Sequence, residues 1–247
     1  MPGEPKLSWA VPEEFPELRT REIHLWCASL DQPGAPDAAA AGLSADEIAR
    51  AASFRFERDR GRFVAARRNL RQVLARYVGR EADKLVFSYG KFGKPTLIHQ
   101  AAATGPLDPA MSNLTFNQSH CGPLWLLAVA WNQPVGVDVE ELRDLEDLAL
   151  VEAQIFPGDE LAHQQSLPPP ERQLGFFHRW TQRESAVKFQ GLGFDPAAKF
   201  IPPDQSELHV PAENYVAALA YGGTPVRVRK FGWSESVKMP VPAVAAG

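Results

Sequence analysis

Two pairs of ionisable residues in this sequence have the spacing expected of a chemical site. Glu184 and Lys188 are four residues apart in RWTQRESAVKFQG, whose pattern predicts a helix, so both side chains leave the same face. Asp138 and Glu140 are two residues apart in GVDVE, where alternation with valines predicts a strand, so both carboxylates also share a face. Each pair alone is explained by a surface ion pair or a solvated strand edge. Their joint occurrence points to chemistry.

Phosphoryl transfer is the chemistry that needs these groups together. Two or three carboxylates, with positions left for water and phosphate oxygens, suit Mg²⁺ better than zinc. Glu184 completes a trio with Asp138 and Glu140 if the helix lies against the strand. Lys188, one helical turn further on, would then meet a phosphate held by the same ion. The reaction requires a divalent ion, a cationic clamp and a carboxylate near the attacking hydroxyl.

An arginine-rich segment offers a surface for an anion. Residues 50–80 contain ten arginines and two acidic residues, whereas the whole chain of 247 residues has a net charge of −4. Because an extended nucleic-acid surface usually makes a whole domain basic, a small polyphosphate ligand fits this distribution better. A solvated basic helix face explains the arginines equally well.

Hydrophobic periodicity and turn residues predict the elements that must position these groups. Ser44, with Glu47 three residues later, forms a capping box that opens a helix. A second helix is expected to end near Gly79, and a third to contain Trp180 as a core anchor and to end near Gly191. Apolar runs and alternation predict strands at residues 22–30, 114–120, 124–131, 134–142, 215–221 and 225–233.

The order of these elements predicts an α+β fold of two similar lobes. Each half runs strand, helix and then strands, with a junction near Asn132. We expect an N-terminal lobe over residues 20–131 and a C-terminal lobe over residues 132–235. Residues 1–19 and 236–247 are expected to form extended or flexible tails.

Five motifs, in order, carry a family resemblance. GVDVE, followed by RWTQRESAVK, resembles the paired signature of the 4'-phosphopantetheinyl transferases of the larger, surfactin-synthetase-activating type. FRFERDRGRFVAARRNLRQVL is similar to that family's N-terminal helix, FGKP to its Gly-Lys-Pro turn, and FNQSH to its Asn-x-Ser-His strand end. Order and approximate spacing match from Ile23 to Trp233, and HLWCASLDQP is also similar to cyanobacterial members.

The resemblance implies a reaction and an architecture. The chain would transfer the 4'-phosphopantetheine moiety of coenzyme A (CoA) to a serine of an apo acyl or peptidyl carrier protein, releasing adenosine 3',5'-bisphosphate. Such transfer activates fatty-acid, polyketide or nonribosomal peptide synthases. The family also implies lobes related by a pseudo-twofold axis, CoA in the cleft between them, a monomer, and Mg²⁺ as cofactor, with Mn²⁺ as an alternative.

Matching positions imply the role of each residue. Asp138, Glu140 and Glu184 would hold the metal ion, and Glu184 would also take the proton of the carrier serine. Lys188 would neutralise the diphosphate and His120 would contact a CoA phosphate, which places both with Glu184 as catalytic residues. Further CoA-binding positions are Ser119 at the phosphates, Arg50 and Arg62 at the 3'-phosphate, and Lys94 and Pro95 on the adenine side.

Four residues depart from the family pattern. Arg183 stands where Lys is usual, Gln118 where a hydrophobic residue is usual, Cys121 where Ser is common, and Glu47 where some members have Lys. Arg183 keeps the charge but does not release a proton near neutral pH, so it is assigned no general-acid role. Glu47 would leave the 3'-phosphate with fewer cationic partners.

Two other classes of function explain less of the sequence. A noncatalytic module that binds CoA or a nucleotide would explain the arginines and the Gly-Lys-Pro turn, but not three acids that converge with a lysine. A nucleic-acid-binding protein would explain only the arginines. The longest apolar run, Leu124 to Trp131, is too short for a bilayer, and the first residues do not read as a secretory signal. We therefore expect a cytoplasmic protein that binds neither membrane nor nucleic acid.

Overall fold

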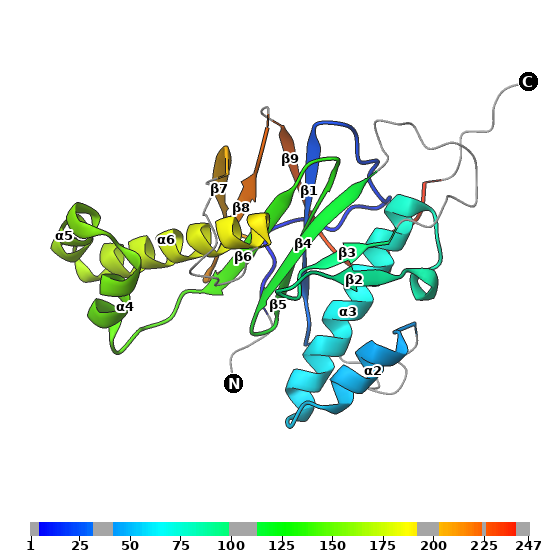
Figure 1. Ribbon diagram of the computed structural model, residues 1–247, viewed down its shortest axis with the longest axis horizontal. Helices are drawn as coiled ribbons and strands as arrows, with labels where there is room; N and C mark the ends of the chain where they lie inside the picture. The colour runs from blue at the N-terminus through cyan, green and yellow to red at the C-terminus, as the bar shows by residue number, and fades with distance from the viewer. Residues whose placement is uncertain (1–4, 32–41, 99–112, 192–202, 224–225, 241–247) are drawn as a thin grey trace, which may run out of the picture.

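The computed structural model describes residues 5–31, 42–98, 113–191, 203–223 and 226–240 (Figure 1). The first half of the chain contains β1 (Glu22–Ser29), α2 (Ala45–Ala52), α3 (Glu57–Val78), a 3-10 turn (Ala82–Lys84), β2 (Phe87–Tyr89), β3 (Pro95–Leu97), β4 (Leu114–Cys121) and β5 (Leu124–Trp131). The second half contains β6 (Val135–Glu141), α4 (Leu148–Ile155), α5 (Gly158–Ser166), α6 (Pro169–Gln190), β7 (Gln205–His209), β8 (Tyr215–Tyr221) and β9 (Arg227–Gly232).

Two sheets repeat one topology. In the first sheet, β5 lies between β1 and β4, and in the second, β8 lies between β6 and β7, with antiparallel pairing throughout these strands. In each half, a long helix lies along the chain between the first strand of the sheet and the hairpin that completes it, β4–β5 or β7–β8. These helices, α3 and α6, each have 22 residues. The chain is therefore α+β, and its two halves share the similarity that the predicted lobes require.

The last strand crosses the predicted division of the chain. β9, which falls in the expected C-terminal lobe, pairs in parallel with β1 of the first sheet. The N-terminal arm also packs on this sheet, because Phe15 and Leu18 are buried in its core. The division at residue 132 and the extent of the tails stay predictions, and residues 1–4 and 241–247 lie outside the described part of the chain.

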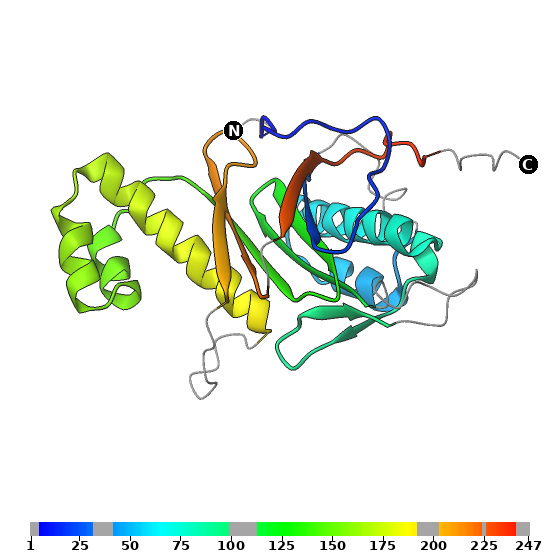
Figure 2. The ribbon, with the colours of Figure 1, turned by 90° about the horizontal axis from the view of Figure 1, so that it is seen from above.

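The two sheets pack face to face, and one long helix packs on each outer face. Ile23, Leu25 and Cys27 from β1 meet Val137 and Val139 from β6 in one buried cluster. Full burial of an aliphatic side chain of this size stabilises the fold by about 1.5–3 kcal/mol. Helix α6 covers the second sheet, and α3 packs on the first sheet through Leu70, Val73 and Leu74 (Figure 2).

The predicted helix boundaries are confirmed. Glu47 and Ser44 form the capping box at the start of α2. Gly79 ends α3 with φ = 63° and Gly191 ends α6 with φ = 68°, the left-handed conformation in which glycine avoids a side-chain penalty. No helix in the described residues is both long enough and apolar enough to cross a membrane.

Gly136 permits the closest approach between α6 and β6. A Cβ atom at this position would lie 2.6 Å from Cα of Phe189 and would overlap the carbonyl oxygen of Ser185 and the backbone nitrogen of Phe189. These are backbone atoms of α6, so a side chain here could be accommodated only by moving the helix away from the strand.

Substitution of Gly136 is therefore expected to destabilise the protein. Gly136→Ala should lower the melting temperature by about 6 °C or more, because overpacking against backbone costs about 3 kcal/mol or more. Gly61→Ala is the matched control: Gly61 lies within α3, and a Cβ added there would meet no heavy atom within 4 Å. That change should raise the melting temperature slightly, since Ala favours helices by about 0.5–1 kcal/mol. Equal melting temperatures for the two variants would contradict the close-packing argument.

Candidate active site

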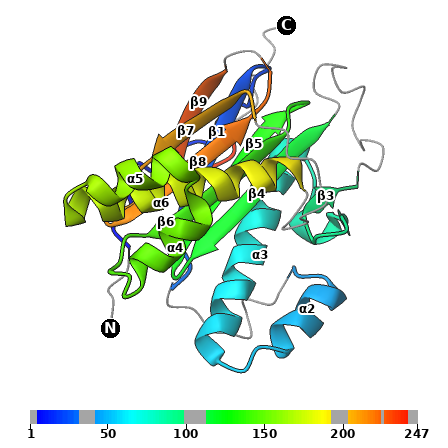
Figure 3. The ribbon, with the colours of Figure 1, turned by 60° about the vertical axis from the view of Figure 1, so that its left-hand side comes forward.

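Strand β6 presents Asp138 and Glu140 toward helix α6. Val137 and Val139 point the opposite way, into the core between the sheets, so the alternation expected from the sequence is confirmed. Helix α6 lies across the second sheet (Figure 3). Because the helix approaches so closely at Gly136, its polar side chains reach the two carboxylates on the strand.

Lys188, Asp138 and Ser119 form a hydrogen-bonded triangle. Nζ of Lys188 donates to Oδ1 of Asp138 at 2.5 Å and to Oγ of Ser119 at 2.8 Å, and that hydroxyl donates to the same Oδ1 at 2.9 Å. Asp138 is buried, whereas 31% of the Lys188 side chain is exposed. Three elements, β4, β6 and α6, thus meet at one carboxylate, and the ammonium group compensates its buried charge.

Glu184 lies one helical turn before Lys188 and is only 8% exposed. Burial, and then the negative charge of Asp138, raise the pKa of Glu184. Oε1 of Glu184 and Oδ2 of Asp138 are both buried and have no hydrogen-bond partner in the part of the chain that the structure describes. Buried carboxylate oxygens without a partner are costly, and a cation near both would remove that cost.

Glu140 is held by three neighbours. Its Oε1 accepts a hydrogen bond from Nε1 of Trp180 at 3.1 Å, and its Oε2 lies 3.6 Å from Sγ of Cys121 and 3.6 Å from the guanidinium of Arg143. Trp180 packs on the hydrophobic cluster around Phe176 and Phe177, as expected of a core anchor, and its indole N–H also binds this carboxylate. The sequence carries no signal for this contact, because the two residues are 40 positions apart.

The carboxylates fit a hard divalent cation only in part. Among the described residues, no group of three His, Cys, Asp or Glu side chains is arranged to hold a metal ion. The two unpartnered oxygens of Asp138 and Glu184 match what Mg²⁺ commonly takes from a protein, namely one or two carboxylates, with water and phosphate oxygens in the other positions. Glu140 does not complete a three-ligand group with them in the described structure, and its Oε1 accepts the hydrogen bond from Trp180.

Side chains of β4 join the first sheet to β6. Oδ1 of Asn117 accepts a hydrogen bond from the backbone N–H of Val137 at 2.8 Å. Ser119 and Cys121 follow at alternate positions on β4, and they contact Asp138 and Glu140 respectively. Alternate residues of a strand share a face, so this row of contacts runs along the seam between the two halves of the chain.

His120 and Arg62 lie on the opposite face of β4 from Ser119. His120 lies at the exposed end of the strand. Partial desolvation of its imidazole by nearby protein atoms lowers its pKa, and the positive charges of Lys188 and Arg62 lower it further. Arg62 makes a bidentate ion pair with Asp31, at 2.7 and 2.6 Å, which lowers the pKa of that carboxyl group. The guanidinium that was expected to bind a phosphate therefore already has an anionic partner.

The other predicted CoA-binding residues are placed as follows. Arg50 lies in the last turn of α2, with its guanidinium 5.5 Å from the centre of the Phe54 ring. Pro95 begins β3. Lys94 donates three hydrogen bonds to backbone carbonyl groups at the start of β6 and at the end of α6. Contact between any of these residues and CoA stays a prediction.

Two departures from the family pattern have structural partners. Glu47 is buried and accepts hydrogen bonds from Arg67 and Arg71, so it stabilises the packing of α2 on α3. Gln118 accepts a hydrogen bond from Nε1 of Trp125 at 2.9 Å.

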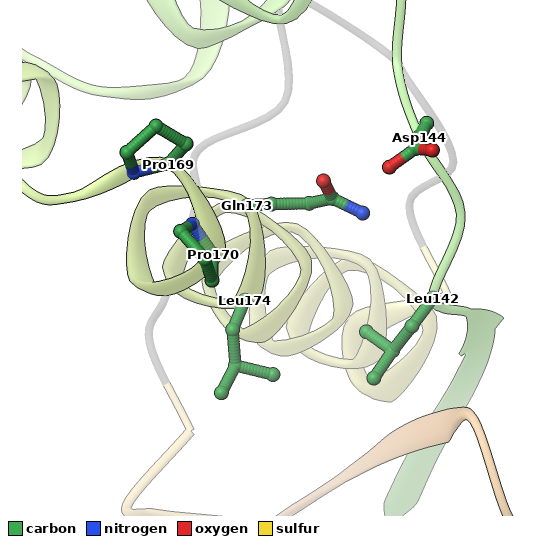
Figure 4. A pocket seen from close by; sticks show the side chains of 6 residues that line it. All are labelled: Leu142, Asp144, Pro169, Pro170, Gln173 and Leu174. Atoms are coloured by element: carbon green, nitrogen blue, oxygen red, sulfur yellow. The ribbon is translucent and has the colours of Figure 1, made fainter.

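A hollow of about 390 Å³ lies at the other end of α6. It is lined by Leu142, Asp144, Pro169, Pro170, Gln173 and Leu174 (Figure 4). Leu174 precedes Glu184 by ten residues, or about 15 Å along the helix axis. The hollow is therefore separate from the cluster of carboxylates.

Comparison with known proteins agrees with this arrangement. Residues 134–231 match the family described as "4'-phosphopantetheinyl transferase superfamily", and residues 32–132 match "4'-phosphopantetheinyl transferase, N-terminal". The chain is 37% identical over 231 residues to the 4'-phosphopantetheinyl transferase HetI of Nostoc sp. (strain PCC 7120), an alignment covering 87% of this chain and 91% of that protein. The chain therefore belongs to the 4'-phosphopantetheinyl transferase superfamily.

More distant relatives support the same assignment. A 4'-phosphopantetheinyl transferase of Bacillus subtilis is 25% identical, with 86% of this chain and 88% of the relative aligned. The 4'-phosphopantetheinyl transferase Sfp of Bacillus subtilis (strain 168) is 22% identical, with 70% and 69% aligned. The resemblance noted in the sequence is thus confirmed.

The charge on Glu184 is expected to destabilise the metal-free protein. Because the pKa of Glu184 is raised in the folded state, the ionised form is disfavoured by folding, and this penalty is complete above the folded-state pKa and absent below the unfolded-state pKa. In EDTA at pH 8, Glu184→Gln should raise the melting temperature by about 2–4 °C, corresponding to about 1 kcal/mol. The difference should disappear near pH 4.

The exposed residue Glu213 supplies the control for this measurement. Glu213→Gln should change the melting temperature by less than about 1 °C, since surface substitutions have small effects. Addition of Mg²⁺ should stabilise the wild-type protein more than Glu184→Gln. A Glu184→Gln variant that is less stable than the wild type in EDTA at pH 8 would contradict the argument.

Proposed function

We propose that this protein transfers the 4'-phosphopantetheine moiety of CoA to a serine of apo acyl or peptidyl carrier proteins. The observation that carries the proposal is a cluster in which Lys188 binds Ser119 and one oxygen of Asp138. The other oxygen of Asp138 and Oε1 of Glu184 are buried there without a hydrogen-bond partner among the described residues. Such a group is costly for an isolated fold and suits a ligand with a diphosphate and a cation. Membership of the superfamily supports the same reaction.

Asp138, Glu140 and Glu184 would hold Mg²⁺, or Mn²⁺ in its place. The ion would neutralise charge on the diphosphate of CoA as the bond to the leaving group breaks. The buried oxygens of Asp138 and Glu184 support this assignment, and Glu140 is the outer member of the set.

Glu184 would accept the proton of the carrier serine. Its raised pKa suits a general base better than an ordinary carboxylate would, because proton transfer is most effective near the working pH. The serine oxygen then forms a bond to the phosphorus that carries the pantetheine arm. The bond from that phosphorus to the oxygen of adenosine 3',5'-bisphosphate breaks, and this product leaves with the electron pair.

Lys188 would stabilise the charge that develops on the diphosphate. Its ammonium group has three N–H donors, and two of them bind Asp138 and Ser119 in the structure. The exposed part of its side chain leaves the third donor able to reach a phosphate oxygen. Removal of Asp138 would therefore disturb both the metal ion and the orientation of Lys188.

The remaining predicted residues would bind the rest of CoA. His120 and Ser119 would contact its phosphates, Arg50 and Arg62 the 3'-phosphate, and Pro95 the adenine side. The family resemblance implies adenine-side contact for Lys94 too, but in the structure its ammonium group binds three backbone carbonyl groups. A phosphate would compete with Asp31 for the guanidinium of Arg62.

A noncatalytic CoA-binding module is less well supported. Such a module has no need to bury Glu184 near Asp138 while one oxygen of each carboxyl group lacks a hydrogen-bond partner among the described residues. We further propose that the protein works as a monomer in the cytoplasm, with CoA and carrier proteins, rather than nucleic acid or a membrane, as its partners.

Intact-mass spectrometry tests the reaction directly. Purified protein, CoA and Mg²⁺ should add the mass of one phosphopantetheine group to an apo carrier protein, and EDTA should prevent the addition. Glu184→Gln should slow transfer at least about 100-fold, within the range lost when a general base is removed. No addition to any of several apo acyl and peptidyl carrier proteins, despite measurable CoA binding, would favour the binding module.

Arg62→Ala tests the 3'-phosphate assignment. We expect KM for CoA to rise about tenfold or more with a smaller change in kcat, because the 3'-phosphate is remote from the reacting bond. Asp31→Asn is the matched control, since it weakens the same ion pair but keeps Arg62. That variant should leave KM unchanged or lower. A fall in kcat at constant KM for Arg62→Ala would contradict the assignment.

A further inference from the structure

Lys94 connects the turn between β2 and β3 to the end of helix α6. Its Nζ donates to the carbonyl oxygen of Lys188 at 2.6 Å, to that of Phe189 at 3.1 Å and to that of Val135 at 3.3 Å. The first two acceptors belong to the last turn of α6, and the third lies at the start of β6. One ammonium group therefore binds both elements that carry the carboxylate cluster.

The three acceptors suit a lysine well. The last four carbonyl groups of an α-helix have no partner within the helix, and the partial negative charge at that end favours a cation. Lys94 supplies donors to two of these groups. Burial lowers the pKa of Lys94 to about 8, so at pH 7 the side chain is still an ammonium group with three N–H donors for three carbonyl oxygens.

Gly191 leaves room for this contact. It ends α6 in the left-handed conformation, and a Cβ at this position would lie 3.3 Å from Cδ of Lys94. The aliphatic part of Lys94 thus passes directly over the helix cap. Gly191 therefore allows the backbone to adopt the left-handed conformation, and its lack of a side chain leaves space for Lys94.

We propose that Lys94 is a positioning residue, which fixes the last turn of α6 and thereby holds Lys188 against Asp138. This role differs from the contact with the adenine side of CoA that the family resemblance implies, and it rests on the proposed function for its effect on catalysis. Lys188 is bound through its backbone by Lys94 and through its side chain by Asp138. A shift of the helix end would therefore move the ammonium group that faces the diphosphate.

The two roles of Lys94 predict different kinetics. In Lys94→Met, loss of positioning should lower kcat by about 100-fold, the order expected when a catalytic group is misplaced by about 1 Å, while KM for CoA changes less than about threefold. Lys94→Arg, which retains charge and N–H donors, should recover part of kcat. Lys91→Met, in the same exposed turn, should behave as the wild type. A rise in KM for CoA at constant kcat would overturn the proposal in favour of direct CoA contact.

Hydrogen exchange gives a readout that does not depend on activity. Lys94→Met should speed amide exchange in the last turn of α6, residues 187–190, by about tenfold or more, because local opening governs exchange there. The last turn of α3, residues 75–78, ends in the same type of glycine cap and is the internal control. Unchanged exchange in α6 would overturn the proposal.

The proposed reaction and the role of Lys94 can fail separately. If the wild-type protein transfers no phosphopantetheine, the proposed function fails, but faster exchange confined to α6 would still support the role of Lys94 in fixing the helix. If Lys94→Met does not fold, Lys94→Gln, which loses the charge and can serve at most two of the three carbonyl oxygens, is measured in the same way and should show part of both effects. Normal kcat together with normal exchange in that variant would overturn the proposal.

Discussion

The close contact between α6 and β6 at Gly136 is the constraint on which the candidate site depends. Glu184 and Lys188 are borne by the helix, and Asp138 by the strand. The two backbones approach so closely that a Cβ at Gly136 would overlap backbone atoms of the helix, and this approach brings Glu184 and Lys188 to the face of the strand that carries Asp138. Hydrophobic packing holds the elements together in a general way, but this glycine sets the distance at which the charged groups face each other.

That short distance creates an electrostatic imbalance. Asp138 and Glu184 are both buried, and of these two carboxyl groups Lys188 hydrogen bonds only to Asp138 in the described structure. The pKa of Glu184 is raised, because burial and the neighbouring Asp138 both disfavour its ionised form. A cation bound near both carboxyl groups would offset the cost of burial and the repulsion between them. The folded protein therefore favours binding of a cation at this site. The same imbalance makes Glu184 suitable as a base.

Local patterns predicted the long elements but missed several short ones, namely α4, α5, β2, β3 and β7, and contacts distant in sequence were predicted poorly. Alternation in GVDVE was enough to place Asp138 and Glu140 on one face, and Gly191 was enough to end α6. Hydrogen bonds from Lys94 to the carbonyl of Lys188, and from Trp180 to Glu140, join residues 94 and 40 positions apart. Periodicity describes one element at a time, so it cannot tell which side chain of one element meets the backbone of another.

The long helices of the two halves, α3 and α6, differ in the side chains that they bury. Both helices bury polar side chains, but those of α3, such as Arg67 and Arg71, are paired with Glu47, whereas Glu184 of α6 keeps a buried oxygen without a partner among the described residues. Burial of Glu184 is therefore costly, and α6 is attached at both ends. Phe177 anchors its first half in a separate cluster with α4, and hydrogen bonds from β2–β3 hold its last turn. A helix fixed at both ends can carry a costly polar centre, and that centre is where a ligand would restore the missing stability.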